Sequence, residues 1–306
     1  MNPQILMDGL ISGATIGLGA IGLTLTYSIL RFANFTHGDF LAWGAYLTLT
    51  VVAGLGGLFA GLGAGHPLGP FSFGWDLPLA MLGGAALTVL LALGLDRVLF
   101  GRLRARGADI IIIVMASFGA SMALRSGLEF IFTAQPTYFT DALQIARPIG
   151  AGIRATPDQL LVIALTALLV VGLNLLLTRT AIGRAMRAVS ENPGLGEVYG
   201  IDVRGVVRIT WIIGAGLATV AGVMAGLLVQ IRPYMGFDLL LPLFAAAILG
   251  GIGSIPGAML GGLIIGLAEA ATVQVFGAEW RAAVGFVVLV LVLLLRPQGL
   301  FGQERA

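Results

Sequence analysis

The chain has 306 residues, of which 58% are hydrophobic and only 10% are charged, and its formal net charge is +2. This small number of polar residues cannot cover the surface of a water-soluble globule of this length. The composition therefore excludes a soluble protein and predicts an integral membrane protein with no nucleic-acid partner. The sequence contains neither lysine nor cysteine, which excludes a lysine-containing P-loop, a Schiff-base lysine, thiolate catalysis and disulfides.

The first apolar segment covers residues 5–30, longer than the ~20 residues needed to cross a ~30 Å hydrocarbon core. It lacks a basic n-region and a cleavage signal, so we expect a retained helix. Gly9, Gly13 and Gly17 recur every four residues, which predicts close approach of a second helix. Residues 17–22 also match the dinucleotide-binding pattern GxGxxG, but no strand precedes them, and we interpret them as part of the helix.

A polar cluster follows Arg31 and leads into a second apolar segment that ends near residue 60. Thr36 or Asp39 can cap the start of that helix. Ionisable groups at membrane depth also tend to face a cavity, so the cluster is also a candidate for the translocation path. His66, the other histidine, lies in a distant loop, so no metal site is expected. The candidate path residues here are Asn34, Thr36, His37 and Asp39.

Residues 54–77 are rich in glycine and contain two prolines, which predicts an irregular outer connection. A third span covers about residues 78–100, and the arginines beside its end place that end in the cytoplasm by the positive-inside rule. These arginines are Arg97, Arg102, Arg104 and Arg106.

The fourth span covers about residues 109–133 and carries four polar side chains. Ser117 and Ser121 are further candidates for the translocation path. Arg125 and Glu129 are four residues apart, so they share a helix face and are expected to pair locally. Structural and functional roles for that pair both remain open.

A helix-start pattern at residues 156–158 opens the fifth span, with Thr156 as N-cap and Pro157 in the first helical position. This span, about residues 158–177, leads to a basic segment at 178–208. Its arginines place it on the same cytoplasmic side as the earlier arginine cluster, which puts the amino terminus outside. They are Arg179, Arg184, Arg187, Arg204 and Arg208.

A short helix is predicted inside the basic segment. Asn192 can cap it, Pro193 fits its first turn, and Gly200 can supply a left-handed stop. Asp202 can then cap the next helix, which runs to about Gln230. An ordinary solvated loop would explain the arginines but would leave these caps unexplained.

The apolar region 239–272 is interrupted by Gly250, Gly251, Gly253 and Pro256. Its first piece has about 12 residues, which at ~1.5 Å per residue spans roughly 18 Å and is too short to cross the membrane. The final helix, about residues 281–295, is expected to end in the cytoplasm, so region 239–272 must begin and end outside, as a re-entrant pair or two short buried passes. Glu269 has two open interpretations, a structural hydrogen bond or a place on the path.

Four separated pieces of the sequence resemble, in the same order, permeases of branched-chain amino acid ABC transporters. Residues 183–202 are similar to the cytoplasmic ATPase-docking loop of that family, although Gly194 and Gly196 stand where its motif is usually more helical. The other pieces are Ala33–Asp39 with Gly44–Tyr46, Gly250–Gly257 and Arg296–Gly302.

The resemblance implies one all-α permease domain over residues 1–306, with eight to ten membrane-inserted helices in a bacterial inner membrane. It implies alternating access without a bound cofactor, and as partners a homologous permease, two ATPase subunits and an extracytoplasmic substrate-binding protein. Sister permeases handle urea or short amides, so these remain alternative substrates. The implied docking residues are Arg187, Glu191, Asn192, Pro193, Glu197 and Gly200.

Two other classes compete with this interpretation. An ion-coupled secondary transporter normally buries several acidic or histidine side chains, and here His37, Asp39 and Glu269 alone qualify. An intramembrane enzyme needs a convergent nucleophile, base or metal set, and neither HExxH nor GxSxG occurs.

Overall fold

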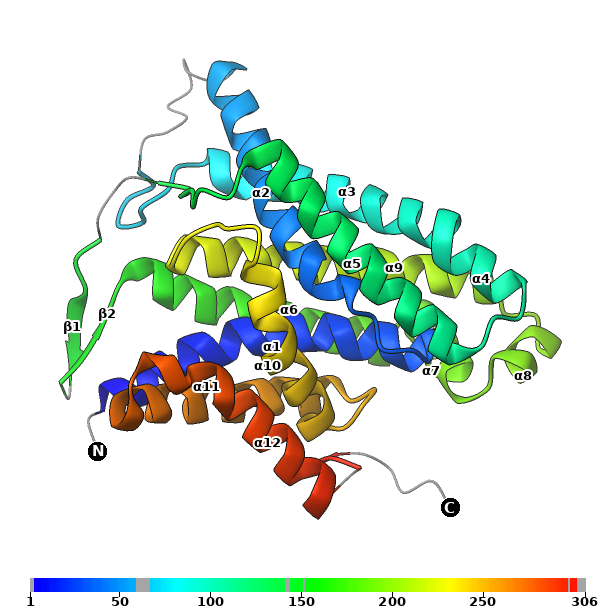
Figure 1. Ribbon diagram of the computed structural model, residues 1–306. Coiled ribbons are helices and arrows are strands. Elements are labelled where there is room, and N and C mark those ends of the chain that lie inside the picture. Colours follow the sequence, from blue (N-terminus) through cyan, green and yellow to red (C-terminus); the bar gives the residue numbers. More distant parts are fainter. Residues whose placement is uncertain (1–2, 59–66, 141–143, 151, 297, 302–306) are drawn as a thin grey trace.

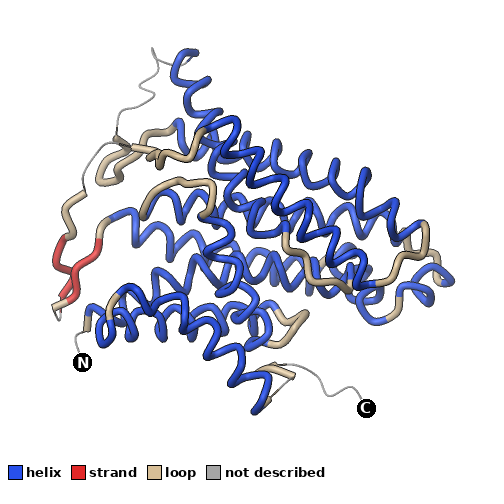
Figure 2. The backbone as a smooth tube through the Cα atoms, in the orientation of Figure 1, coloured by secondary structure: helices blue, strands red, loops and turns tan. Residues whose placement is uncertain are grey.

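A computed structural model describes residues 3–58, 67–140, 144–150, 152–296 and 298–301. The helices lie side by side in one bundle, and a small hairpin projects from one end (Figure 1, Figure 2). We call the end that carries α4, α7 and α8 the α8 end, and the opposite end the hairpin end. The elements are α1 (Gln4–Leu30), α2 (Thr36–Leu58), α3 (Asp76–Leu95), α4 (Gly101–Ala105), α5 (Ile110–Phe132), β1 (Arg147–Gly150), β2 (Ile153–Ala155), α6 (Pro157–Arg179), α7 (Ala181–Glu191), α8 (Pro193–Val198), α9 (Val203–Leu228), α10 (Met235–Gly250), α11 (Ile255–Phe276) and α12 (Arg281–Leu295).

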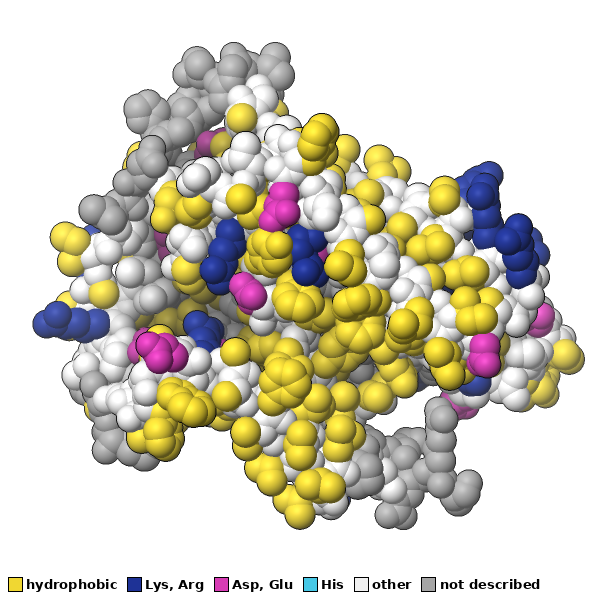
Figure 3. Space-filling view, viewed as in Figure 1, with side chains coloured by type: hydrophobic (Ala, Val, Ile, Leu, Met, Phe, Trp, Pro, Cys, Tyr) yellow, Lys and Arg dark blue, Asp and Glu magenta, His cyan; other side chains and the backbone are white. Residues whose placement is uncertain are grey.

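The predicted all-α membrane fold is confirmed. Within the described residues, 8 helices are long and apolar enough to cross a membrane, and α10 is a shorter apolar helix. Apolar side chains cover much of the face seen in Figure 3, while arginine side chains gather at its right-hand end, over α4. A lipid-facing middle and a charged end are what a multi-pass membrane protein requires.

Helix α1 lies in the centre of the bundle and packs along α11 through small residues. A Cβ atom on Gly13 would lie 2.8 Å from the Cα of Leu263, and one on Gly9 would lie 2.8 Å from the Cα of Leu267. Real Cβ atoms do not approach so closely, so the two backbones pack against each other only because these positions are glycine. The glycine stripe predicted in the first span is therefore a helix contact, and the GxGxxG pattern beside it is helical.

The connection between α1 and α2 turns back into the bundle. Arg31 ends α1 in a left-handed conformation (φ 58°), and residues 32–35 are non-helical. The Nε2 atom of His37, in the first turn of α2, lies 3.0 Å from the carbonyl oxygen of Gly19. Gly19 precedes the end of α1 by about three turns, or roughly 16 Å at ~1.5 Å per residue. Helix α2 therefore starts well inside the protein and not at the α8 end.

The predicted interruption after residue 250 is confirmed, with different lengths on its two sides. Helix α10 has 16 residues, not about 12, and ends at Gly250, and α11 has 22 residues, enough for a full span. Gly251 (φ 94°) and Gly253 (φ 90°) adopt left-handed conformations that favour glycine, and Pro256 occupies the first turn of α11. The backbone N–H of Gly253 donates to Oγ1 of Thr24 at 2.7 Å, which fixes the break against α1.

Two local features near the hairpin end differ in how well the sequence predicts them. The start of α6 forms as expected, with a capping box between Thr156 and Gln159 and Pro157 in the first turn. The antiparallel hairpin β1–β2 was not predicted. It is anchored to α1, because the backbone N–H of Arg154 donates to Oε1 of Gln4 at 2.9 Å.

The third span is longer than predicted. Helix α3, a π-helical turn over residues 96–100 and α4 run continuously from Asp76 to Ala105. Phe100, in the π-helical turn, stacks on Trp211 of α9 with ring centroids 5.6 Å apart. Part of the predicted irregular connection, residues 59–66, lies outside the described residues.

Candidate functional site

Two helices, not one, form the basic segment. Helix α7 was not predicted, and it starts where the Thr180 side chain accepts from the Gly183 N–H at 3.1 Å. Its buried side chains Met186 and Val189 pack in one cluster with Leu25, near the end of α1. The segment is therefore held against the membrane helices by a hydrophobic face.

Helix α8 forms as predicted. Oδ1 of Asn192 accepts from the Leu195 N–H at 3.0 Å, Pro193 lies in the first turn, and Gly200 follows with φ 80°. The sequence did not single out its apolar surface. Leu195, Val198 and Tyr199 are 53%, 82% and 79% exposed, although they lie in the most polar part of the chain. Monomeric soluble surfaces rarely group apolar side chains in this way without a partner.

The other predicted docking residues lie around α8 but differ in role. The Arg187 side chain donates to the carbonyl oxygen of Leu177, so it links α7 to the end of α6. Glu191 is exposed at the end of α7, and Glu197 is exposed on α8. Of these, only the two glutamates present a free charged surface.

Arg31 connects α7 to the turn that leads into α2. Its Nη2 atom donates to the carbonyl oxygens of Ser190 at 3.2 Å and Glu191 at 2.8 Å. Cations stabilise the exposed carbonyls at a helix C-terminus. Arg31 therefore joins the end of α7, which leads into α8, to the residues between α1 and α2.

The polar cluster after Arg31 is almost completely buried. Oδ1 of Asn34 accepts from the backbone N–H of Thr36 at 3.2 Å and from its hydroxyl at 2.6 Å. Asn34 therefore satisfies one free N–H at the start of α2, a cap that was not predicted for it. From α5, Ser117 joins the cluster, because its hydroxyl donates to the carbonyl oxygen of Ala33 at 3.3 Å.

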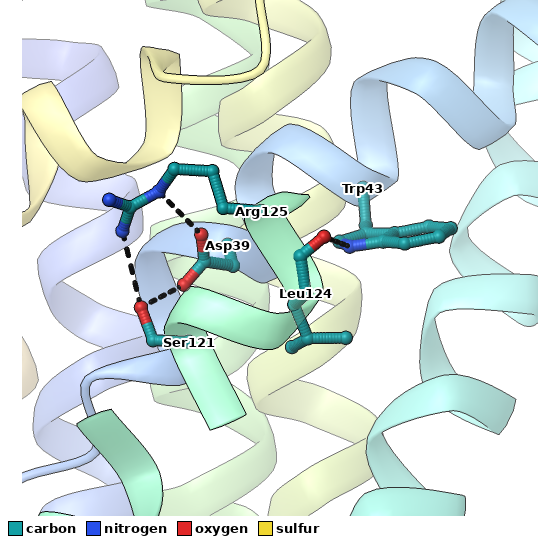
Figure 4. Close-up of polar contacts among 5 residues, drawn as sticks. All are labelled: Asp39, Trp43, Ser121, Leu124 and Arg125. Carbon is teal, nitrogen blue, oxygen red and sulfur yellow. Dashed lines mark hydrogen bonds and ion pairs between the residues drawn. The ribbon is translucent and has the colours of Figure 1, made fainter. Parts of the chain in front are cut away.

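Asp39 is 1% exposed and interacts with two side chains of α5 (Figure 4). Ser121 donates a short hydrogen bond to Oδ2 of Asp39, and Nε of Arg125 lies 3.5 Å from its Oδ1. Nη2 of Arg125 also donates to Oγ of Ser121 at 3.3 Å. The expected local pair of Arg125 with Glu129 was wrong, because the arginine points to α2 instead.

Aromatic rings from α10 and the turn before it cover Arg125. Its Cζ atom lies 4.1 Å from the ring centroid of Phe237 and 5.4 Å from that of Tyr234. Both are cation–π distances. Helices α2, α5 and α10 therefore meet at this arginine. The sequence could have indicated a site at Arg125, because an arginine inside an apolar helix is usually functional.

Glu269 is part of a separate contact. It is 3% exposed, and its Oε2 accepts from Nε of Arg281 at 2.8 Å. Nη2 of Arg281 also donates to Oγ of Ser12 at 3.4 Å, so the pair joins α11, the start of α12 and α1. This arrangement favours the structural interpretation of Glu269. Among the described residues, no group of three or more histidine, cysteine, aspartate or glutamate side chains could hold a metal ion.

Comparisons with known proteins agree over nearly the whole chain. A family described as "Branched-chain amino acid transport system / permease component" matches residues 5–293. The chain is 35% identical to the high-affinity branched-chain amino acid transport system permease protein BraD of Pseudomonas aeruginosa, over 98% of this chain and 95% of the relative. It is 33% identical to the permease protein LivH of Escherichia coli, with the same coverage.

More distant relatives extend the match. The probable branched-chain amino acid transport permease protein LivH of Methanocaldococcus jannaschii is 29% identical over 98% of this chain and 93% of the relative. The solved structure of PsaBC from Streptococcus pneumoniae in complex with a Fab superposes with a TM-score of 0.50, covering 96% of this chain and 92% of that chain at 14% identity. At that identity the likeness concerns the fold alone.

Proposed function

This chain belongs to the family of permease components of branched-chain amino acid transport systems, and we propose that it forms one half of the membrane pathway of an ATP-driven importer. In this proposal a homologous permease supplies the other half, two ATPase subunits bind at the cytoplasmic surface, and an extracytoplasmic protein delivers the substrate. The protein is a multi-pass membrane protein, and its place is the bacterial inner membrane.

The observation that carries the proposal is the apolar surface of α8. Leu195, Val198 and Tyr199 project from a helix that is capped at its start and followed by a left-handed glycine. A short rigid helix with three exposed apolar side chains suits insertion into a groove of another protein. Because the chain lacks the lysine of a P-loop, that other protein is the source of ATP hydrolysis.

The proposed substrates are leucine, isoleucine and valine, as the names of BraD and LivH indicate for those proteins. Deleting the gene in its own organism is expected to reduce uptake of labelled leucine, and restoring the gene is expected to return it. Uptake of labelled urea and acetamide serves as the control. Loss of urea or amide uptake with unchanged leucine uptake would instead support the alternative substrates.

Movement of α8 is proposed to reach the translocation path through Arg31, which holds the end of α7. Arg31→Gln is expected to reduce leucine uptake about tenfold, because hydrogen bonds made by a charged group are worth ~1.5–3 kcal/mol. ATP hydrolysis by the purified complex is expected to continue, since α8 itself is unchanged. The measurement is the number of ATP molecules hydrolysed per leucine transported in proteoliposomes.

Arg204→Gln provides the matched control for Arg31. Arg204 is exposed at the same end of the bundle, in the first turn of α9. Its removal changes the surface charge equally but leaves the α7 carbonyls bound. Equal coupling ratios in Arg31→Gln and in the unaltered complex would contradict the proposed route.

A further inference from the structure

Two helices begin beside each other inside the protein. Helix α2 starts at Thr36 and α10 at Met235, and a Cβ atom on Gly38 would lie 2.5 Å from the carbonyl oxygen of Gly236. No side chain caps the start of α10. Helix N-termini carry a partial positive charge and free N–H groups, and Asn34 already binds the first N–H of α2, so it is the start of α10 that favours an anionic group.

Three buried polar atoms at this junction have no hydrogen-bond partner among the described residues. They are Nδ2 of Asn34, Oδ1 of Asp39 and Nε of Arg125, of which the last two form an ion pair with each other at 3.5 Å. Asn34 and Asp39 are each 1% exposed, so bulk water does not satisfy them. Buried polar groups are nearly always hydrogen-bonded, so a buried ion pair without hydrogen-bond geometry calls for a ligand or a second conformation that supplies the missing bonds.

The charges of Arg125 and Asp39 are complementary to those of an amino acid headgroup. Arg125 offers a donor beside the start of α10, which suits a carboxylate. Asp39 offers an acceptor that suits an ammonium group. The Arg125–Asp39 contact, at 3.5 Å between Nε and Oδ1, does not meet hydrogen-bond geometry. Separating the two side chains therefore breaks no hydrogen bond between them, and a ligand with a carboxylate and an ammonium group would replace their charge attraction.

An aromatic group lies about two helical turns from these charges, roughly 10 Å along α5 and α10 at ~1.5 Å per residue. The ring of Phe35 packs against Phe118 of α5 and Phe244 of α10, with centroids 5.7 and 5.5 Å apart. Phe118 is 42% exposed, so this aromatic group reaches the surface of the subunit.

We propose that the junction of α2, α5 and α10 is a binding site for a zwitterionic α-amino acid. The substrate carboxylate binds Arg125 and the N-terminus of α10, its ammonium group binds Asp39, and the two protein side chains pair with each other when the site is empty. This inference rests on the proposed function, since it assigns a place for the substrate of the same transporter.

Labelling of a single cysteine tests the site directly, because the chain contains no cysteine of its own. Phe237→Cys places the thiol beside Arg125, and Val229→Cys, at a position 69% exposed, is the control. In the complete transporter during ATP turnover, saturating L-leucine is expected to slow maleimide labelling of Phe237→Cys about fivefold or more. Leucinamide lacks the carboxylate and 4-methylpentanoate lacks the ammonium group, so neither is expected to slow it.

Unchanged labelling in the presence of leucine, or equal protection by all three compounds, would overturn the site. Slower labelling at Val229→Cys as well would overturn it too, because protection would then come from a global change. Leucine uptake in the gene-deletion strain tests the proposed function independently of the proposed binding site. If uptake depends on the gene but leucine gives no protection, the proposed function stands and the site fails.

The double variant Asp39→Asn with Arg125→Gln separates binding from a purely structural ion pair. It removes both charges together, so no unpaired charge stays buried and folding is expected to persist. A binding site predicts that uptake falls more than about tenfold while the complex assembles and its melting temperature stays close to that of the unaltered complex. Near-normal uptake by the double variant would show that the pair is structural only.

Discussion

Replacement of the exposed apolar side chains of α8 by Val198→Asp with Tyr199→Asp is expected to abolish leucine uptake. These side chains are 82% and 79% exposed, so they support nothing inside the subunit. Aspartate in an apolar groove of an ATPase would bury an unpaired charge, and such changes at an interface centre cost ~2–5 kcal/mol or more. That corresponds to a loss of binding of roughly 30- to 5,000-fold.

The measurement is co-purification of the ATPase subunits with the tagged permease, together with uptake. The conservative pair Val198→Ile with Tyr199→Phe keeps the apolar surface and is expected to retain both. Membrane insertion is expected to be normal in both double variants, because no buried contact is altered. Retention of bound ATPase and full uptake by the aspartate variant would remove α8 as the docking element.

Gly13→Leu is expected to prevent α1 and α11 from packing. The Cα atom of Leu263 is only 2.8 Å from where a Cβ would stand, and the Gly262 carbonyl oxygen is 3.0 Å away. Backbone atoms cannot move aside as a flexible side chain does, so the cost is expected to reach the upper end of overpacking, about 3 kcal/mol or more. Because α1 forms the centre of the bundle, the yield and melting temperature of the detergent-purified protein are expected to fall sharply.

Gly172→Leu is the matched control for this change. Gly172 lies within α6 and is exposed, and no heavy atom of the described residues lies within 4 Å of its ideal Cβ position. The same substitution there adds an apolar side chain to the surface and is expected to leave the yield unchanged. If yield and melting temperature fall equally in both variants, the effect comes from adding leucine to any membrane helix and not from the α1–α11 contact.

Features set by neighbouring residues could be predicted from the sequence. The caps at Thr156, Asn192 and Asp202 all form, because each needs only a side chain and an N–H group two or three residues away. The membrane spans could be predicted because length and hydropathy alone decide them. Helix α7 was missed because its apolar residues occupy one face of a short segment whose other face is charged and exposed.

Features that depend on distant residues could not be predicted. Arg125 and Glu129 satisfy the helical spacing for a pair, but Asp39 lies within reach of Arg125 only after α2 and α5 have packed. The depth of the first turn of α2 likewise follows from the contact of His37 with Gly19, which the order of residues does not reveal. The polar residue types correctly indicated a special site in the sequence. The partners of these residues could be identified only from the folded structure.

The distance along the chain between Asp39 and its partners has a consequence for biogenesis. Asp39 and Ser121 are 82 residues apart in the chain. At roughly 5–20 residues per second, the ribosome therefore completes Ser121 about 4 to 16 seconds after Asp39. During that interval α2 has left the ribosome with a carboxylate near its start and no α5 to receive it. If α2 enters lipid before α5 is made, the Asp39 carboxylate meets hydrocarbon at a cost of ~2.5–3.5 kcal/mol, a cost that the Ser121 and Arg125 side chains remove once α5 has packed.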